Sequence, residues 1–288
     1  MAFFSLLAVF PLITAALSTV SYFADPADVE GIADTVAAVI PGEAYGILEG
    51  QVNSVLSAPP ITASFGIFVS LGFVFISAGA GIRAMMRAMN VAYEEVETRN
   101  PFVFFFFGML MTLGSLIFVW ASLFVIIGVS AVLAYANIED TAGLVSGKLP
   151  WILLMTMFSV ACGVMYRFGP SRRPARKRWV LPGIGFALIS WLTISFGFSR
   201  FVTRFGGYNE TFGGLASVVI LLIWLWLTAM VVIIGAELNS ELERQTITDT
   251  TRGPWRPVGS RGAAMADFIA RNTEVRNEET LQETGESV

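Results

Sequence analysis

The sequence of 288 residues has no histidine, a single cysteine (Cys162) and few charges. Without histidine, the chain cannot form a Ser-His-Asp or Cys-His nucleophile, a histidine-ligated zinc or haem site, or an imidazole switch near physiological pH. A single thiol cannot form a disulfide within the chain. These absences exclude the commonest hydrolytic and metal-dependent centres.

Motifs for phosphate-dependent or hydrolytic chemistry are also missing. The sequence has no P-loop, no Gly-x-Ser-x-Gly turn and no cluster of Asp and Glu with metal-ligand spacing. Glu94, Glu95 and Glu97 are too close together in sequence to form a metal site without partners from elsewhere. We therefore expect no enzyme activity, no catalytic residue, no bound metal and no cofactor.

Long apolar stretches dominate the sequence. Hydrophobic residues make up 55% of the chain and charged residues 14%, with a mean hydropathy of +0.69. About 20 apolar residues in a helix cross a hydrocarbon core that is ~30 Å thick. Six stretches meet this requirement, and the last has 24 consecutive uncharged residues. The sequence predicts an all-α, polytopic membrane protein with a bundle of six transmembrane helices, at residues 2–23, 61–82, 101–136, 149–166, 179–200 and 213–236.

Two polar segments accompany these spans. Residues 24–60 carry six acids and no base, and their apolar residues recur at helical spacing. We expect two short amphipathic helices here, separated at Pro41-Gly42 and ended by a pair of prolines. Residues 244–288 form a polar tail that is predicted to be largely disordered, with one or two helical turns in MADFIARN (265–272).

The distribution of basic residues predicts the orientation in the membrane. With the N-terminus in the cytoplasm, the two cytoplasmic loops carry nine Lys and Arg residues, against three in the outer loops. The positive-inside rule favours this arrangement, which places both termini in the cytoplasm and the acidic segment 24–60 outside. Six of the bases lie in RFGPSRRPARKR (167–178). Between two spans, this run is a topology signal with affinity for anionic lipid headgroups rather than a nucleic-acid site.

The first apolar stretch begins directly after Met1. It lacks the positive n-region of a signal peptide, although Phe23-Ala24 before Asp25 is compatible with a cleavage site. We interpret the stretch as a span, with cleavage as the alternative. Its closeness to Met1 also leads us to expect that an upstream segment is missing.

Two pairs of arginines are the candidate substrate-binding residues. Arg83 and Arg87 lie four residues apart where the second span ends, and Arg200 and Arg204 repeat this spacing at the end of the fifth. Residues at i and i+4 share a helix face, so each pair could present two forked donors to one anion. The repeat is also compatible with two inverted three-helix halves, as in secondary transporters. The alternative is that these arginines only anchor helix ends at the interface.

Polar residues near the two pairs complete the candidate anion or helix-pairing site. Arg200 and Arg204 lie on the predicted outer side, against the positive-inside bias, so we expect Glu210, an anionic headgroup or a substrate near them. Glu237 closes the sixth span on the inner side, where it can meet the inner arginine pair or remain a plain interfacial carboxylate. The residues added to the pairs are Tyr208, Asn209, Glu210, Glu237 and Asn239.

Five segments stand out by their order and spacing: AFFSLLAVFPLI, RAMNVAYEEVETR, YRFGP, FSRFVTRFGGYNETFGGL and LLIWLWLTAMVVIIGAELN. Together they resemble the YihY/BrkB family of bacterial inner-membrane proteins, once described as ribonuclease BN-like. Phe212 stands where the family often has tyrosine, and family members usually carry an additional segment before the first span. The resemblance implies six spans, an inner-membrane location and suggested roles in transport or in the cell envelope.

Two functional hypotheses from different classes follow. The first is a transporter-like or lipid-handling membrane protein of unknown substrate, which we also expect to be able to form homo-oligomers. The second is a non-transporting scaffold that organises envelope partners through its acidic segment and its tail. The absence of histidine and of metal-spaced acids argues against the ribonuclease label.

Overall fold

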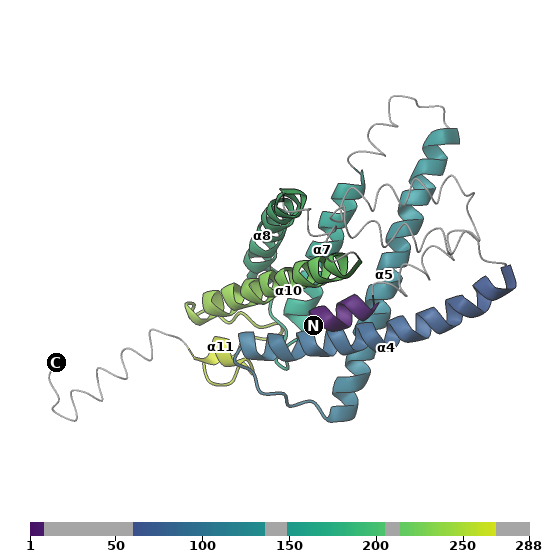
Figure 1. The fold of residues 1–288 in the computed structure, drawn as a ribbon. Helices are drawn as coiled ribbons and strands as arrows, with labels where there is room; N and C mark the ends of the chain where they lie inside the picture. The colour runs from purple at the N-terminus through teal and green to yellow at the C-terminus, as the bar shows by residue number, and fades with distance from the viewer. Residues whose placement is uncertain (9–59, 136–148, 205–213, 269–288) are drawn as a thin grey trace, which may run out of the picture. The chain divides into compact units, whose positions relative to one another are not determined.

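The computed structural model describes residues 1–8, 60–135, 149–204 and 214–268, and these residues are mainly helical (Figure 1). A short helix covers residues 2–8. The other helices are α4 (Pro60–Ala92), α5 (Pro101–Tyr135), α7 (Leu149–Phe168), α8 (Lys177–Arg204), α10 (Gly214–Arg244) and α11 (Ala264–Asp267). Within the described ranges there is no strand, only an isolated antiparallel β-bridge between Ala175 and Thr251. The all-α prediction is therefore confirmed for these residues.

Four helical segments are long and apolar enough to cross a membrane: Pro101–Ala121, Trp151–Phe168, Lys177–Val202 and Val218–Arg244. Each coincides with a predicted span. The predicted second span, 61–82, lies inside α4, which continues to Ala92. Most of the first predicted span, and the amphipathic helices expected within 24–60, fall outside the described residues. The structure thus supports a multi-pass helical membrane protein, and the count of six spans stays a prediction.

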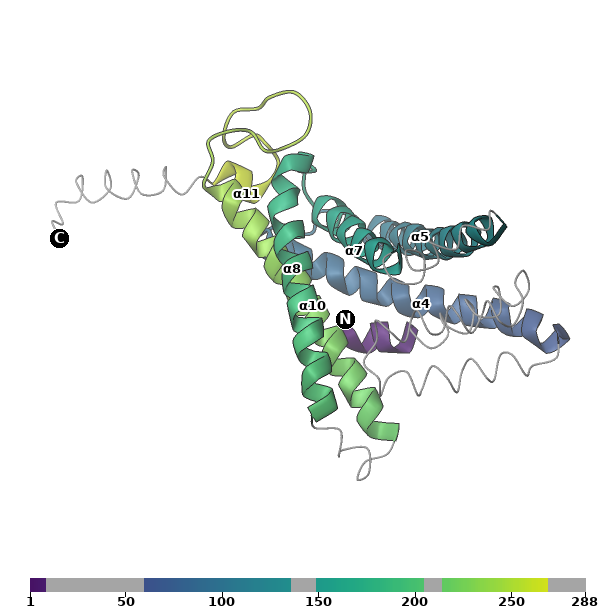
Figure 2. The same cartoon turned by 90° about the horizontal axis from the view of Figure 1, so that it is seen from above.

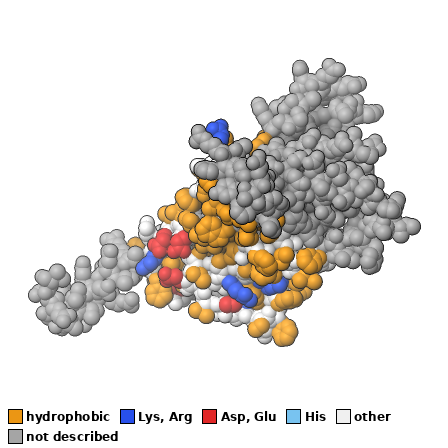
Figure 3. All heavy atoms as spheres, in the orientation of Figure 1, with side chains coloured by type: hydrophobic (Ala, Val, Ile, Leu, Met, Phe, Trp, Pro, Cys, Tyr) orange, Lys and Arg blue, Asp and Glu red, His pale blue; other side chains and the backbone are white. Residues whose placement is uncertain are grey.

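The apolar side chains of these spans mostly face outward. No more than 22% of the residues in any of the four segments are buried within the chain. On α5, Phe102 is 85% exposed and Phe106 is 71% exposed, and hydrophobic side chains cover much of the described surface seen in Figure 3. Exposing apolar area to water costs about 25 cal/mol per Å². Such helices are therefore suited to an environment of hydrocarbon.

The chain forms two compact units. The first consists of Met1–Ala84, Pro101–Phe158 and Trp191–Ala229, and the second of Met85–Asn100, Ser159–Ser190 and Met230–Val288. In the first unit, α8 and α10 lie side by side (Figure 2). The Trp224 indole N–H donates to Ser195 Oγ at 3.2 Å, and the Trp191 indole N–H donates to Thr228 Oγ1 at 3.2 Å. These bonds satisfy indole donors that would otherwise lie unpaired in an apolar setting.

The second unit contains helix ends, the connections between them and the tail. At the end of α4, the Glu95 N–H donates to the Asn90 carbonyl at 2.8 Å, and Glu94 adopts a φ of 50°. A residue in the left-handed region commonly ends a helix in this way, although glycine is the usual occupant. The turn orients Tyr93 and Glu95, whose side chains both contact other segments of the unit.

The first part of the tail differs from the expectation of disorder. Residues 245–268 fold against the connection between α7 and α8, and Ala263, Met265 and Ala266 are buried. The backbone hydrogen bonds run from Arg173 to Gly262, from Arg176 to Thr250 and from Arg252 to Pro174. Disorder is the wrong expectation here because the polar groups of this segment have partners elsewhere in the unit. The single turn of α11 agrees with the helical turn expected in 265–272, and residues 269–288 lie outside the described part.

Candidate functional site

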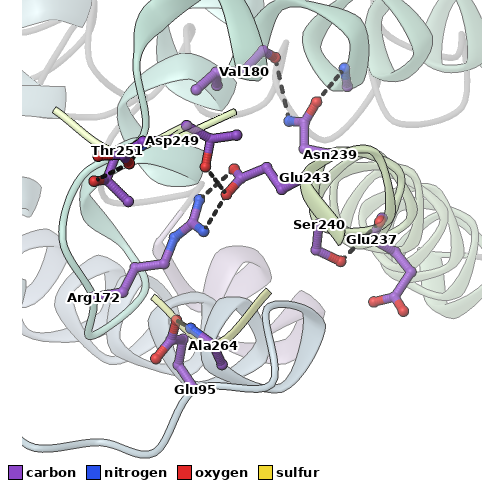
Figure 4. A network of polar contacts seen from close by, with 12 residues as sticks. Glu95, Arg172, Val180, Glu237, Asn239, Ser240, Glu243, Asp249, Thr251 and Ala264 are labelled. Atoms are coloured by element: carbon purple, nitrogen blue, oxygen red, sulfur yellow. Dashed lines mark hydrogen bonds and ion pairs between the residues drawn. The ribbon is translucent and has the colours of Figure 1, made fainter. Parts of the chain in front are cut away.

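Three helices of the second unit are joined by side chains that bond to main-chain groups. The Tyr166 hydroxyl of α7 donates to the Val232 carbonyl of α10 at 2.8 Å. Asn239 of α10 accepts a hydrogen bond from the Gly183 N–H of α8 at 2.7 Å and donates one to the Val180 carbonyl at 3.2 Å (Figure 4). Tyr166 and Asn239 are both fully buried. Polar contacts of this kind hold helices together in an apolar environment, where an unpaired polar group is unfavourable.

Asn239 contacts α8 at the point where a proline interrupts its hydrogen-bond ladder. Pro182 lies inside α8 and has no N–H, so the Arg178 carbonyl, four residues earlier, lacks its usual helical donor. The two groups that Asn239 binds flank this proline. A carboxamide supplies both an acceptor and a donor, as this position requires. Asn239 therefore adds two hydrogen bonds to α8 beside its proline.

The same crossing of α8 and α10 requires two glycines. A Cβ atom on Gly183 would collide with the Gly235 carbonyl and with the Asn239 side chain. A Cβ atom on Gly235 would collide with the Tyr166 hydroxyl. Gly185, in contrast, has open space around the position of a Cβ. Close approach of the two backbones thus depends on particular glycines, as in small-residue helix contacts generally.

A buried ion pair lies one turn further along α10. Both terminal nitrogens of Arg172 donate to the Glu243 carboxylate at 2.8 Å, and neither side chain is exposed. The Arg172 guanidinium lies 4.0 Å from the centre of the Tyr93 ring, and the Thr250 hydroxyl donates to Glu243 at 3.0 Å. Buried charges are tolerated when such additional contacts satisfy them. Burial raises the pKa of Tyr93 to about 12, so its hydroxyl stays protonated at neutral pH.

Glu95 connects the end of α4 to the tail. Its carboxylate accepts the Ala264 N–H at 2.7 Å, at the start of α11 (Figure 4). Partial burial raises the pKa of Glu95 above its ordinary value. Nearby, the Asn90 side chain accepts the Ser171 N–H at 2.7 Å and donates to Glu97 at 2.8 Å. We call the connected set Tyr93, Arg172, Glu243 and Thr250 the polar network.

The end of α10 and the tail together bind half of the bases in the run 167–178. Three of its six bases bind the end of α10 or the tail: Arg172 binds Glu243, Arg173 donates to the Pro254 carbonyl at 3.1 Å, and Arg176 donates to the Thr251 carbonyl at 3.0 Å. Lys177 and Arg178, the first residues of α8, are exposed. Sequence reasoning missed this use of the run. The available signal was weak: Glu243, a single acid just before the tail.

Arg83, in the first unit, occupies a close-fitting site between α4 and α5. Its guanidinium lies 4.7 Å from the centre of the Phe105 ring. A Cβ on Gly108 would collide with the carbon stem of Arg83, and a Cβ on Gly79 would lie 3.0 Å from a guanidinium nitrogen. Two glycines thus make the room that this side chain occupies. A half-buried guanidinium over an aromatic ring is a strong and directional anion donor.

Three of the remaining predicted site residues lie in the described part of the chain, and all three are exposed. Arg87, one turn after Arg83, is exposed. Arg200 is exposed, with its guanidinium 4.7 Å from the centre of a phenylalanine ring one turn earlier, and Glu237 is also exposed. The side chain of Arg204 and all of Tyr208, Asn209 and Glu210 lie outside the described part of the chain. Their roles, and a contact between Glu237 and the inner arginines, stay predictions.

The side chains at these places join helices and the tail to one another. Within the described ranges, no three or more His, Cys, Asp or Glu side chains come together in a group that could hold a metal ion. The Arg172 and Glu243 side chains bind each other, Asn239 binds the backbone of α8, and all three side chains are buried. Arg83 remains half-buried and is therefore the better placed of these groups to meet a ligand.

Comparisons with known proteins agree with the membrane architecture. The model of the family described as Virulence factor BrkB matches residues 1–259. The chain is 30% identical over 248 residues to a UPF0761 membrane protein of Aliivibrio salmonicida (strain LFI1238), with 84% of this chain and 76% of the relative covered. It is 25% identical over 250 residues to the ribonuclease-like protein YfkH of Bacillus subtilis (strain 168), with 85% and 88% covered. No solved structure matches the chain. The resemblance in the sequence is confirmed, and the chain belongs to the Virulence factor BrkB family.

Proposed function

We propose that this protein spans the bacterial inner membrane with both termini in the cytoplasm, and that it transports or handles an anionic substrate. The substrate class is a phosphate-bearing lipid headgroup or a small anion. The family and the apolar helices support the membrane part. The single observation that supports the substrate class is the site of Arg83 between α4 and α5.

A cation in an apolar helix pair is unfavourable unless something compensates for it. Ionisable residues within membrane helices therefore usually serve binding or transport. Arg83 has an aromatic face beneath its guanidinium and two glycines that leave room for it, yet it is not fully buried. A planar guanidinium binds phosphate or carboxylate with two parallel hydrogen bonds. These features together favour an anion at Arg83.

A reconstitution assay tests this proposal. Purified protein in vesicles is assayed for movement of fluorescent phosphatidylglycerol between leaflets and for efflux of inorganic phosphate. We expect the parent protein to move one of these probes, and Arg83→Gln to slow that movement by about tenfold or more, since one charge-assisted contact is worth roughly 1.5–3 kcal/mol. Arg244→Gln, which removes a partly exposed arginine at the end of α10, is the matched control and should behave like the parent.

Two results would overturn the proposal. One is movement of either probe at the parental rate by Arg83→Gln protein that is present at the parental level. The other is a combined result: the parent protein moves neither probe, and stable heterologous partners crosslink to it in membranes. This combination would favour a scaffold. The orientation has its own test: a fluorescent protein fused to the C-terminus should fluoresce, as expected for a cytoplasmic location.

Ribonuclease activity is not part of the proposal. The word ribonuclease-like belongs to the name of the Bacillus subtilis relative. This chain has no histidine to act as a general acid or base. Purified protein that is free of contaminating nucleases and still cleaves transfer RNA would reverse this view.

A further inference from the structure

The loop formed by residues 252–260 is exposed along its whole length, yet buried and partly buried side chains next to it bind its backbone. On one side, the Asp249 carboxylate accepts the Thr251 N–H at 2.9 Å and the Arg256 N–H at 3.0 Å. On the other side, the Asp267 carboxylate accepts the backbone N–H groups of Gly259, Arg261 and Gly262 at 2.8, 3.0 and 3.1 Å. Two carboxylates thus fix the ends of one loop.

A buried arginine completes the support of this loop. Arg261 is only 1% exposed. Its guanidinium donates to four backbone carbonyls, those of Ile247, Thr248, Arg256 and Ala266. The loop therefore has a set shape before any partner arrives, which lowers the entropic cost of binding.

The loop displays a tryptophan between two arginines. Trp255 is 69% exposed and lies in the sequence RGPWRP, with Arg252 and Arg256 on either side. Both arginines are exposed, and the nine residues 252–260 contain no acid. Tryptophan and arginine are enriched where a surface binds a partner, and tryptophan also prefers the boundary between hydrocarbon and water.

The base of the loop is attached next to a membrane entry point. The Arg252 N–H donates to the Pro174 carbonyl at 2.9 Å, and the Arg176 N–H donates to the Thr250 carbonyl at 2.8 Å. The residues that follow Arg176 are Lys177 and Arg178, two exposed cations that begin the membrane-spanning segment of α8. The ion pairs among the described residues do not include either of them. The cations of the loop and those at the start of α8 are thus placed at the boundary where α8 enters the membrane.

We propose that the loop 252–260 and the start of α8 together bind the anionic headgroup layer of the leaflet that α8 enters. Trp255 lies in the interfacial zone, and Arg252 and Arg256, with Lys177 and Arg178, contact lipid phosphates. A lipid surface fits better than a protein partner because the loop is attached beside a span and presents positive charge without an acid. This binding is independent of any transport through Arg83.

Fluorine NMR of protein labelled with fluorotryptophan tests the proposal in nanodiscs. The variant Trp255→Phe identifies the resonance of Trp255. In nanodiscs of phosphatidylglycerol and phosphatidylethanolamine, we expect a headgroup-labelled paramagnetic lipid to broaden this resonance. A water-soluble gadolinium chelate should broaden it roughly tenfold less in these nanodiscs than in nanodiscs of phosphatidylcholine alone. The double variant Arg252→Gln/Arg256→Gln should restore access of the chelate.

Arg244→Gln is the matched control, because this arginine is also partly exposed but lies in α10, paired with Glu241 at 3.5 Å. It should leave the Trp255 resonance unchanged. Equal access of the chelate to Trp255 in anionic and zwitterionic nanodiscs would overturn the proposal. Shielding of Trp255 that occurs only in membrane vesicles from cells, and not in anionic nanodiscs, would also overturn it and assign the loop to a protein partner.

Discussion

Arg172 and Glu243 form a two-pronged ion pair in which neither side chain is exposed and both nitrogen–oxygen distances are 2.8 Å. The two residues are 71 positions apart, so the pair joins the connection between α7 and α8 to the end of α10. Tyr93 and Thr250 extend these contacts to the end of α4 and to the tail. A single charge pair therefore contributes to the positions of four segments of the second unit.

Arg172→Met should release the tail. Removal of one partner of a buried ion pair leaves the other charge uncompensated, which costs about 3–5 kcal/mol. We expect a lower thermal stability and faster trypsin cleavage after Arg261, which is 1% exposed in the folded tail. Mass spectrometry of the tryptic fragments over time measures this cleavage. Because Glu243 is the residue left uncompensated, the double variant Arg172→Met/Glu243→Leu should recover much of the stability.

Arg244→Gln provides the comparison for this prediction. Arg244 and Glu241 are separated by 3.5 Å and are 38% and 43% exposed, and such a surface pair contributes no more than about 0.5 kcal/mol. Its loss should leave the cleavage rate unchanged. If Arg172→Met and Arg244→Gln have the same effect, the buried pair does not hold the tail.

Four apolar helices of the length of a span were predictable from the sequence, whereas the helix ends were not. Hydrocarbon imposes a simple requirement, and a stretch such as 101–136 meets it without a single charge. Hydropathy, however, marks where the hydrocarbon ends and not where the helix ends. The helix α4 continues to Ala92 and α10 to Arg244, beyond their apolar parts, because the polar residues there are bonded within the second unit.

The polar network could not be predicted because its partners are distant in sequence. Arg172 and Glu243 are 71 residues apart, and no local pattern links them. Asn239, a candidate site residue in the sequence, binds the backbone of α8, 56 residues earlier in the chain. Spacing at i and i+4 also predicted one environment for Arg83 and Arg87. Arg83 lies against α5, where glycines leave room for it, and Arg87 is exposed.

Asn239→Leu should destabilise the crossing of α8 and α10. Leucine has a similar volume but leaves the Gly183 N–H without its acceptor, and an unsatisfied buried group costs about 1–3 kcal/mol. We expect a lower melting temperature in detergent, measured by the loss of monodisperse protein on heating. Glu237→Gln, at an exposed position on the same helix, should change the melting temperature little. Equal melting temperatures for parent and Asn239→Leu would contradict this role.

Glu97 should make the turn after α4 sensitive to acid. Partial burial acts to raise the pKa of Glu97, but hydrogen bonds from Arg99 and Asn90 outweigh it and lower the pKa to about 2 from 4.5. A carboxyl whose pKa falls on folding adds stability above its unfolded pKa, and that stability is lost as pH falls from 4.5 towards 2. The difference in melting temperature between parent and Glu97→Gln should therefore be largest near neutral pH and shrink across this range. A constant difference would show that the charge of Glu97 is not involved.

Gly183→Ala and Gly185→Ala should have opposite effects, although the two glycines are two residues apart on α8. At Gly183, a Cβ would collide with a backbone carbonyl, which cannot rotate away, so the helices must separate at a cost of about 1–3 kcal/mol. At Gly185 the space is open, and alanine should stabilise the helix by up to about 1 kcal/mol.

Separation of the helices would also break the bonds of Asn239. The effects of Gly183→Ala and Asn239→Leu should therefore be less than additive in a double-mutant cycle. Melting temperatures of the two alanine variants and of the double variant measure all three effects. Similar melting temperatures for Gly183→Ala and Gly185→Ala would mean that α8 and α10 do not meet at Gly183.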